Sequence, residues 1–123
     1  MSLLTTVAST THPEYVVIDA GFKAFGSESI IGRRDTPGFF WNNMPSFGSV
    51  QGRSDLWLGR LGAESAWLYY KDLSTTNRLQ IGDRIEIVPN SASLALNIHN
   101  MAYGVRNGVI AREFRITGRG LGS

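Results

Sequence analysis

Short segments rich in β-branched and aromatic residues, separated by turn residues, constrain the fold of this chain more than any other feature. They lie near residues 3–9, 14–19, 55–61, 64–70, 84–88 and 109–117, and no stretch keeps a helical period for long. Asn107-Gly108 is the preferred two-residue hairpin turn, because both positions tolerate a positive φ. The pattern predicts an all-β fold, a small antiparallel β-barrel or sandwich.

Residues 26–54 differ from the rest of the chain. They are rich in glycine, proline and asparagine, so long regular elements are not expected there. The same stretch carries four aromatic side chains and a methionine, at Phe39, Phe40, Trp41, Phe47 and Met44. A linker would not hold so many. We therefore expect one long, ordered, aromatic-rich loop, which exposes an apolar patch where its partner surface is absent.

Composition bounds the function further. A chain of 123 residues is expected to form one domain, residues 1–123, and the absence of cysteine excludes disulfides and thiolate ligands. Twelve basic against ten acidic side chains give a net charge of only +2, so no nucleic-acid partner is expected. No apolar run is long enough for a membrane helix, and the first residues do not resemble a signal peptide. We expect a cytoplasmic protein with no membrane partner.

The residues alone point to no self-contained active site. Only His12 and His99 are available as imidazoles, and neither is spaced for a metal site. His12 is expected in an exposed turn. His99 follows an apolar run, where a structural, hydrogen-bonded histidine and a site histidine both remain open. No glycine-rich phosphate loop occurs.

Four blocks of sequence resemble one family, in one order. They are residues 17–24, 61–68, 82–90 and 97–106, and the leading segment 3–7 fits as well. Together they resemble the C-terminal domain of the D-threonine aldolase and D-serine dehydratase family. Those enzymes are pyridoxal-phosphate-dependent lyases of D-amino-acid metabolism with the alanine-racemase fold type. The likeness spans about residues 3–120.

The resemblance implies which partners the chain needs. In the family an N-terminal (β/α)8 barrel holds the cofactor lysine, and the β domain closes the active site, commonly that of the other subunit of a dimer. That barrel is absent from this chain, so no cofactor is expected in it, and Lys23 lies in a β-domain block. The implied partners are a barrel domain or second subunit in a homodimer, with a small D-amino acid as substrate.

The resemblance also implies a set of residues that face the active site. His99 and Glu64 are the candidates for a catalytic role. The whole set consists of Asp19, Lys23, Glu64, Ser65, Asn90, Ser91, Ser93 and His99.

The metal ligands of the family are replaced in this sequence. The family places histidine and then cysteine or aspartate two residues apart after Pro-Asn, where this chain has Ser91 and Ser93. A neutral hydroxyl is a poor ligand for a divalent transition metal, so no metal site is expected. A family histidine next to Glu64 is also replaced, by Ser65.

Three functions follow from these residues. The first is the β domain of an aldolase, dehydratase or racemase relative with a degenerate metal site, acting on a barrel supplied elsewhere. The alternative is a free-standing, non-catalytic module that binds a small ligand or a protein. A barrel that stacks single-stranded nucleic acid on its aromatic residues is the third.

Overall fold

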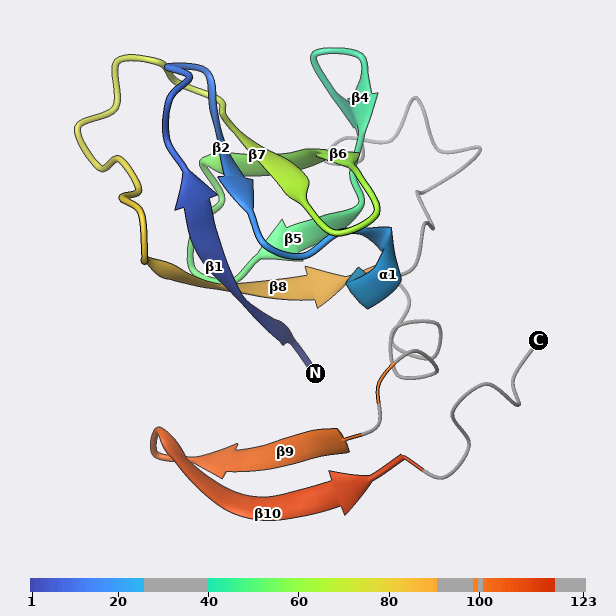
Figure 1. Cartoon of the computed structure of the whole chain (residues 1–123). Helices are drawn as coiled ribbons and strands as arrows, with labels where there is room; N and C mark the ends of the chain where they lie inside the picture. Colours follow the sequence, from blue (N-terminus) through green and yellow to red (C-terminus); the bar gives the residue numbers. More distant parts are fainter. Residues whose placement is uncertain (26–39, 91–98, 100, 117–123) are drawn as a thin grey trace.

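Figure 1 shows the computed structural model of the chain, which describes residues 1–25, 40–90, 99 and 101–116. Ten strands and one helical turn occur in these ranges. In chain order they are β1 (Leu3–Ser9), β2 (Tyr15–Ile18), α1 (Phe22–Phe25), β3 (Phe40–Trp41), β4 (Met44–Pro45), β5 (Gly48–Val50), β6 (Leu56–Leu61), β7 (Ala66–Tyr70), β8 (Arg84–Pro89), β9 (Met101–Arg106) and β10 (Val109–Arg115). Within these ranges no helix has the length and apolar character needed to cross a bilayer.

Six strands form one antiparallel sheet that curls into a nearly closed barrel. Their order is β5-β8-β1-β2-β7-β6, and Figure 1 shows the sheet wrapping round until β5 comes beside β6. The backbone N–H of Phe47, just before β5, donates to the carbonyl of Leu58 in β6 at 3.1 Å. This bond joins the two edges of the sheet. The predicted all-β barrel is confirmed.

The core fills the interior of this barrel. Successive residues of a strand point to opposite faces, so alternate positions on β2, β7 and β8 are buried. The most deeply buried side chains include Ile18, Leu58, Leu68 and Ile87. Burying each one contributes about 1.5–3 kcal/mol, and a one-residue slip of any strand would turn them to solvent. Burial therefore fixes the register of the sheet.

The second half of the aromatic-rich loop forms three short strands instead of an irregular chain. β3 and β4 pair as a small hairpin whose turn, Asn42-Asn43, has positive φ angles of 50° and 61°. Its Trp41 ring lies 6.5 Å from the Trp57 ring on β6, and Phe47 packs against the core. Phe39 and residues 26–38 lie outside the described residues.

The expected apolar patch does not lie on this loop. The large, strongly exposed apolar side chains are concentrated on β9 and β10 instead. Trp41 and Phe40 are half-buried because the β3–β4 hairpin lies against β6 of its own domain. The exposed apolar patch predicted for these aromatics is therefore not found in the part of the loop that the structure describes.

β9 and β10 form a separate two-stranded hairpin. Its turn is Asn107-Gly108, with φ angles of 52° and 77°, as the sequence predicts. No other described strand pairs with it, and Figure 1 shows it standing apart from the barrel. All seven residues of β10 are exposed.

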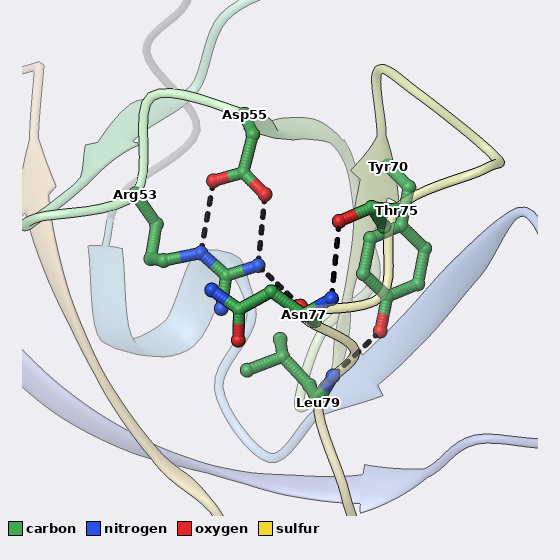
Figure 2. A network of polar contacts seen from close by, with 6 residues as sticks. All are labelled: Arg53, Asp55, Tyr70, Thr75, Asn77 and Leu79. Atoms are coloured by element: carbon green, nitrogen blue, oxygen red, sulfur yellow. Dashed lines mark hydrogen bonds and ion pairs between the residues drawn. The ribbon is translucent and has the colours of Figure 1, made fainter.

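A polar network holds the long connection between β7 and β8 (Figure 2). The Arg53 guanidinium donates two hydrogen bonds of 2.8 Å to the Asp55 carboxylate and a third, of 2.7 Å, to the carbonyl of Asn77. Nearby, the N–H of Leu79 donates to the hydroxyl oxygen of Tyr70 at 2.9 Å. The hydrogen bonds from Arg53 hold the pKa of Asp55 below its usual value. The connection is thus anchored at two points.

Asp55→Asn tests the contribution of this ion pair. The Asp55 side chain is 40% exposed, so solvent screens the pair and we expect the variant to lose only about 1 kcal/mol at neutral pH. A lowered pKa stabilises the fold above the pKa of the unfolded chain, and this stabilisation disappears as pH falls through the folded value.

Urea unfolding between pH 7 and pH 2 measures the difference between the two proteins. We expect the difference to shrink towards zero below about pH 4. A difference that stays constant down to the lowest pH would contradict a role for the charged carboxylate.

Candidate functional site

The antiparallel order of the strands decides which chain reversals share an end of the barrel. β2, β6 and β8 finish at the end where β1, β5 and β7 begin. This end, which we call the α1 end, carries α1, the 62–65 turn and Asn90. The opposite end carries the connection anchored by Arg53. Figure 1 shows α1 and the arrowhead of β8 on the same side of the barrel.

Gly21 allows α1 to lie directly against the 62–65 turn. A Cβ atom at this position would lie 2.1 Å from the carbonyl oxygen of Gly62 and 2.7 Å from that of Ser65. The N–H of Lys23 then donates to the carbonyl of Ala63 at 3.1 Å, and the N–H of Gly62 donates to the carbonyl of Ser65 at 2.7 Å. Backbone contacts therefore fix the position of α1, and only glycine leaves room for them.

Two charged residues of the predicted site form an ion pair on this surface. Lys23 Nζ lies 3.3 Å from Glu64 Oε1, and the side chains are 63% and 80% exposed. A pair this open to water contributes little to stability, because solvent screens it. Both groups stay accessible to a molecule that approaches the α1 end.

The side chains of Asp19 and Asn90 form hydrogen bonds with backbone groups of neighbouring strands. Asp19 Oδ1 accepts a hydrogen bond of 2.9 Å from the N–H of Thr6, so it ties the end of β2 to β1. Asn90 Nδ2 donates to the carbonyl of Ser46 at 2.7 Å, which ties the end of β8 to the start of β5. Both side chains thus hold the rim of the α1 end in place.

His99 reaches the same end from far along the chain. Its Nε2 lies 2.9 Å from the carbonyl oxygen of Ala24, 75 positions earlier in the sequence. A carbonyl can only accept, so Nε2 carries a proton and donates it, and in the neutral form of the ring Nδ1 is the nitrogen with the lone pair. The contact orients a half-buried imidazole next to α1. Sequence reasoning left a structural and a site role open, and this geometry is compatible with both.

The structure thus brings most of the predicted site residues to one end of the barrel. Asp19, Lys23, Glu64, Ser65, Asn90 and His99 all lie at the α1 end. Ser91 and Ser93 lie outside the described residues. In the part of the chain that the structure describes, no three His, Cys, Asp or Glu side chains gather closely enough to hold a metal ion.

A stack of rings on the outside of the barrel was not expected from the sequence. Tyr15 stacks between His12 and Trp67, at centroid distances of 4.6 and 4.4 Å, and Arg60 lies 5.3 Å from the centre of the Trp67 ring. The rings are covered by one another and by a guanidinium, so the stack stabilises the sheet and leaves little ring surface for a base. In the register of β2 and β7, Tyr15 pairs with Tyr69 and Val17 pairs with Trp67, so Tyr15 and Trp67 are diagonal neighbours on one face of the sheet. The alternation of aromatic residues at Trp67 and Tyr69 was the sequence signal for an aromatic face.

The chain matches a protein-family model over residues 1–105. The model is described as "Putative serine dehydratase domain". The match includes every predicted site residue, and it ends before β10 begins.

Individual relatives are similar over nearly the whole chain. The 3-hydroxy-D-aspartate aldolase of Paracoccus denitrificans is 28% identical over 120 residues, which are 98% of this chain and 26% of that enzyme. The crystal structure of D-threonine aldolase from Filomicrobium marinum superposes with a TM-score of 0.78 at 24% identity, over 98% of this chain and 28% of that one. D-threo-3-hydroxyaspartate dehydratase from Delftia sp. HT23 gives 0.71 at 21% identity, over 93% and 31%.

The solved structures share the fold of this chain. The shares covered also show that the chain spans less than a third of the length of these relatives.

Gly21→Ala tests the backbone contact that positions α1. The added methyl group must push back the 62–65 turn, and we expect a loss of about 1–3 kcal/mol in the free energy of unfolding. Gly59→Ala is the matched control, because its Cβ would meet the flexible end of Met44, with the sulfur at 2.8 Å. Urea unfolding compares the two. A smaller loss for Gly21→Ala than for Gly59→Ala would contradict the contact.

Proposed function

The chain belongs to the family of serine dehydratase domains, and we propose that it is the C-terminal β domain of a pyridoxal-phosphate-dependent lyase that acts on a D-amino acid. In this proposal its α1 end closes an active site in a (β/α)8 barrel, commonly that of the second subunit of a cytoplasmic homodimer. The observation that carries the proposal concerns this chain's own β-barrel. Six of the eight predicted site residues lie together at its α1 end. They come from four separate parts of the sequence.

The length of the relatives supports a (β/α)8 barrel domain outside the region that this chain matches. This chain covers only 26–31% of the two aldolases and the dehydratase to which it is similar. The remainder of such a protein has room for a (β/α)8 barrel, which needs about 250 residues. A domain whose polar residues converge at one end, with no enclosed site of its own among the described residues, suits a cover for a site on another domain.

The lysines of this chain do not fit a cofactor site. Pyridoxal phosphate requires a lysine for its Schiff base, and the chain has only Lys23 and Lys71. Lys23 is exposed and paired with Glu64. Lys71 lies 5.3 Å from the centre of the Trp57 ring, outside the α1 end. We therefore assign the cofactor lysine to the barrel and no catalytic step to either residue.

His99 is the proposed acid–base group of the α1 end. The contact with Ala24 fixes its tautomer and leaves Nδ1 as the proton acceptor. The second candidate, Glu64, is exposed and bonded to Lys23. Glu64 would have to give up this ion pair before it could take a proton, so we place His99 before Glu64.

His99→Gln in the full-length protein tests this role. Glutamine keeps a donor for the Ala24 carbonyl but cannot exchange a proton, so we expect kcat towards a D-3-hydroxy amino acid to fall about 10²-fold or more. The pH dependence of kcat should flatten as well. His12→Gln, the same change at the opposite end of the barrel, is the control and should leave kcat unchanged. An unchanged kcat and pH profile in His99→Gln would refute the assignment.

We also propose that this chain has lost the metal site of the related enzymes. Ser91 and Ser93 keep the spacing of the family's ligands, but a serine hydroxyl offers only a weak neutral oxygen to zinc. We expect Ser91→His combined with Ser93→Cys to raise zinc affinity measurably in calorimetry. Ser91→Ala with Ser93→Ala should behave as the unmodified chain does. Micromolar or tighter zinc binding by the unmodified chain, absent from the alanine variant, would contradict the loss.

The non-catalytic alternative makes a different prediction for the same full-length protein. A free-standing module would have neither lyase activity nor a response of any activity to His99→Gln. The kinetic comparison of the two histidine variants therefore separates the two functions.

A further inference from the structure

A surface cavity of about 410 Å³ lies where the two edge strands of the barrel sheet, β5 and β6, meet (Figure 1). Strands β5 and β6, the turn between them and the residue after β7 all contribute to its wall. A volume of this size is typical of sites for small molecules. The lining includes Ser49, Val50, Ser54, Leu56, Trp57 and Lys71, and we call it the Trp57 cavity.

The indole of Trp57 brings to this cavity a hydrogen-bond donor without a partner. The Trp57 side chain is almost fully buried, with the residue 7% exposed. Its Nε1–H forms no hydrogen bond with any of the residues that the structure describes. A buried donor in this state has lost its bonds to water and gained none in return, which destabilises the fold. An acceptor atom on a bound molecule would remove that cost.

The ammonium group of Lys71 supplies the positive charge of the cavity. It lies 5.3 Å from the centre of the Trp57 ring, and it forms no ion pair within the described part of the chain. Arg53 also lines the cavity, but two hydrogen bonds of 2.8 Å bind its guanidinium to the Asp55 carboxylate. One lysine charge is therefore left to attract a ligand, and it matches a single negative charge.

The rest of the lining combines hydroxyl groups with apolar side chains. Ser49 and Ser54 each have a hydroxyl that can donate to an oxygen atom. Val50 and Leu56 offer methyl groups to an apolar ligand surface. A carboxylate carries one negative charge, whereas a phosphate group carries more than one at neutral pH and would leave part of its charge unmatched. The chemistry of the lining thus suits a carboxylate with an apolar body.

We propose that the Trp57 cavity is a second binding site, which takes a small organic carboxylate. The Nε1–H of Trp57 and the serine hydroxyls donate to the carboxylate oxygens, and the Lys71 ammonium balances their charge. The apolar part of the ligand lies against Val50 and Leu56. The cavity shares no residue with the predicted site at the α1 end, so this inference goes beyond the proposed function and does not depend on it.

Isobutyrate is the probe for this site, and isobutyramide, which has nearly the same shape but no charge, is the matched control ligand. We expect isobutyrate to bind the 123-residue chain with a Kd of about 1–10 mM. Binding should shift the amide signals of Gly48 and Gly52, which line the cavity, in heteronuclear magnetic resonance spectra. It should also raise Tm above that measured in sodium chloride of equal ionic strength, because a ligand that binds only the folded state stabilises it. Isobutyramide and inorganic phosphate should each bind at least about tenfold more weakly.

Two pairs of variants test the residues that carry the proposal. Lys71→Met removes the charge and keeps the apolar stem, and Trp57→Phe removes the donor and keeps a ring. Each should weaken isobutyrate binding at least about fivefold, because each removes a direct interaction with the carboxylate. Lys23→Met and Trp67→Phe make the same changes outside the cavity and should bind isobutyrate as the unmodified chain does.

Circular dichroism checks that each variant keeps its β structure. Lys71 is exposed, so the charge can be tested even if the Trp57 variant does not fold. Signals of the cavity that stay unchanged up to about 100 mM isobutyrate would overturn the proposal. Equal responses to isobutyrate and isobutyramide would overturn it as well, and so would equal losses of affinity in Lys71→Met and Lys23→Met.

Discussion

The burial of alternate aliphatic side chains inside a six-stranded barrel is the constraint on which the rest of the structure depends. Ile18, Leu68 and Ile87 can all face the interior in only one register of their strands. Once the register is fixed, the antiparallel order assigns every chain reversal to one of two ends. The α1 end thus follows from packing in the core, and its polar residues are positioned by strands that contribute nothing to chemistry.

Local sequence signals predict the elements well and their assembly poorly. Asn107-Gly108 predicts its hairpin because turn chemistry is local. Asn42-Asn43 makes a similar turn with positive φ, but it was hidden among glycines and prolines that suggested an irregular loop. The position of Trp41 against Trp57 is a tertiary contact, so no window of sequence contains it.

The candidate site shows the same division. The resemblance predicts which residues face an active site, yet the sequence alone leaves the role of His99 open. The contact that fixes its tautomer joins it to Ala24 across 75 positions, and the close approach of Gly21 to the 62–65 turn is equally non-local. Neither contact is signalled by a periodicity or a motif in the sequence. Both become visible only when the barrel brings β2, β6 and the segment after β8 together.

We assign the α1 end to the contact with the (β/α)8 barrel domain, and hydrogen exchange tests that assignment most directly. Amide exchange is compared between the 123-residue chain and the full-length protein. We expect slower exchange in the full-length protein at residues 19–25 and 62–65. We expect no change at residues 71–83, at the opposite end. Protection confined to residues 71–83, or to neither end, would contradict the claim that the α1 end closes an active site.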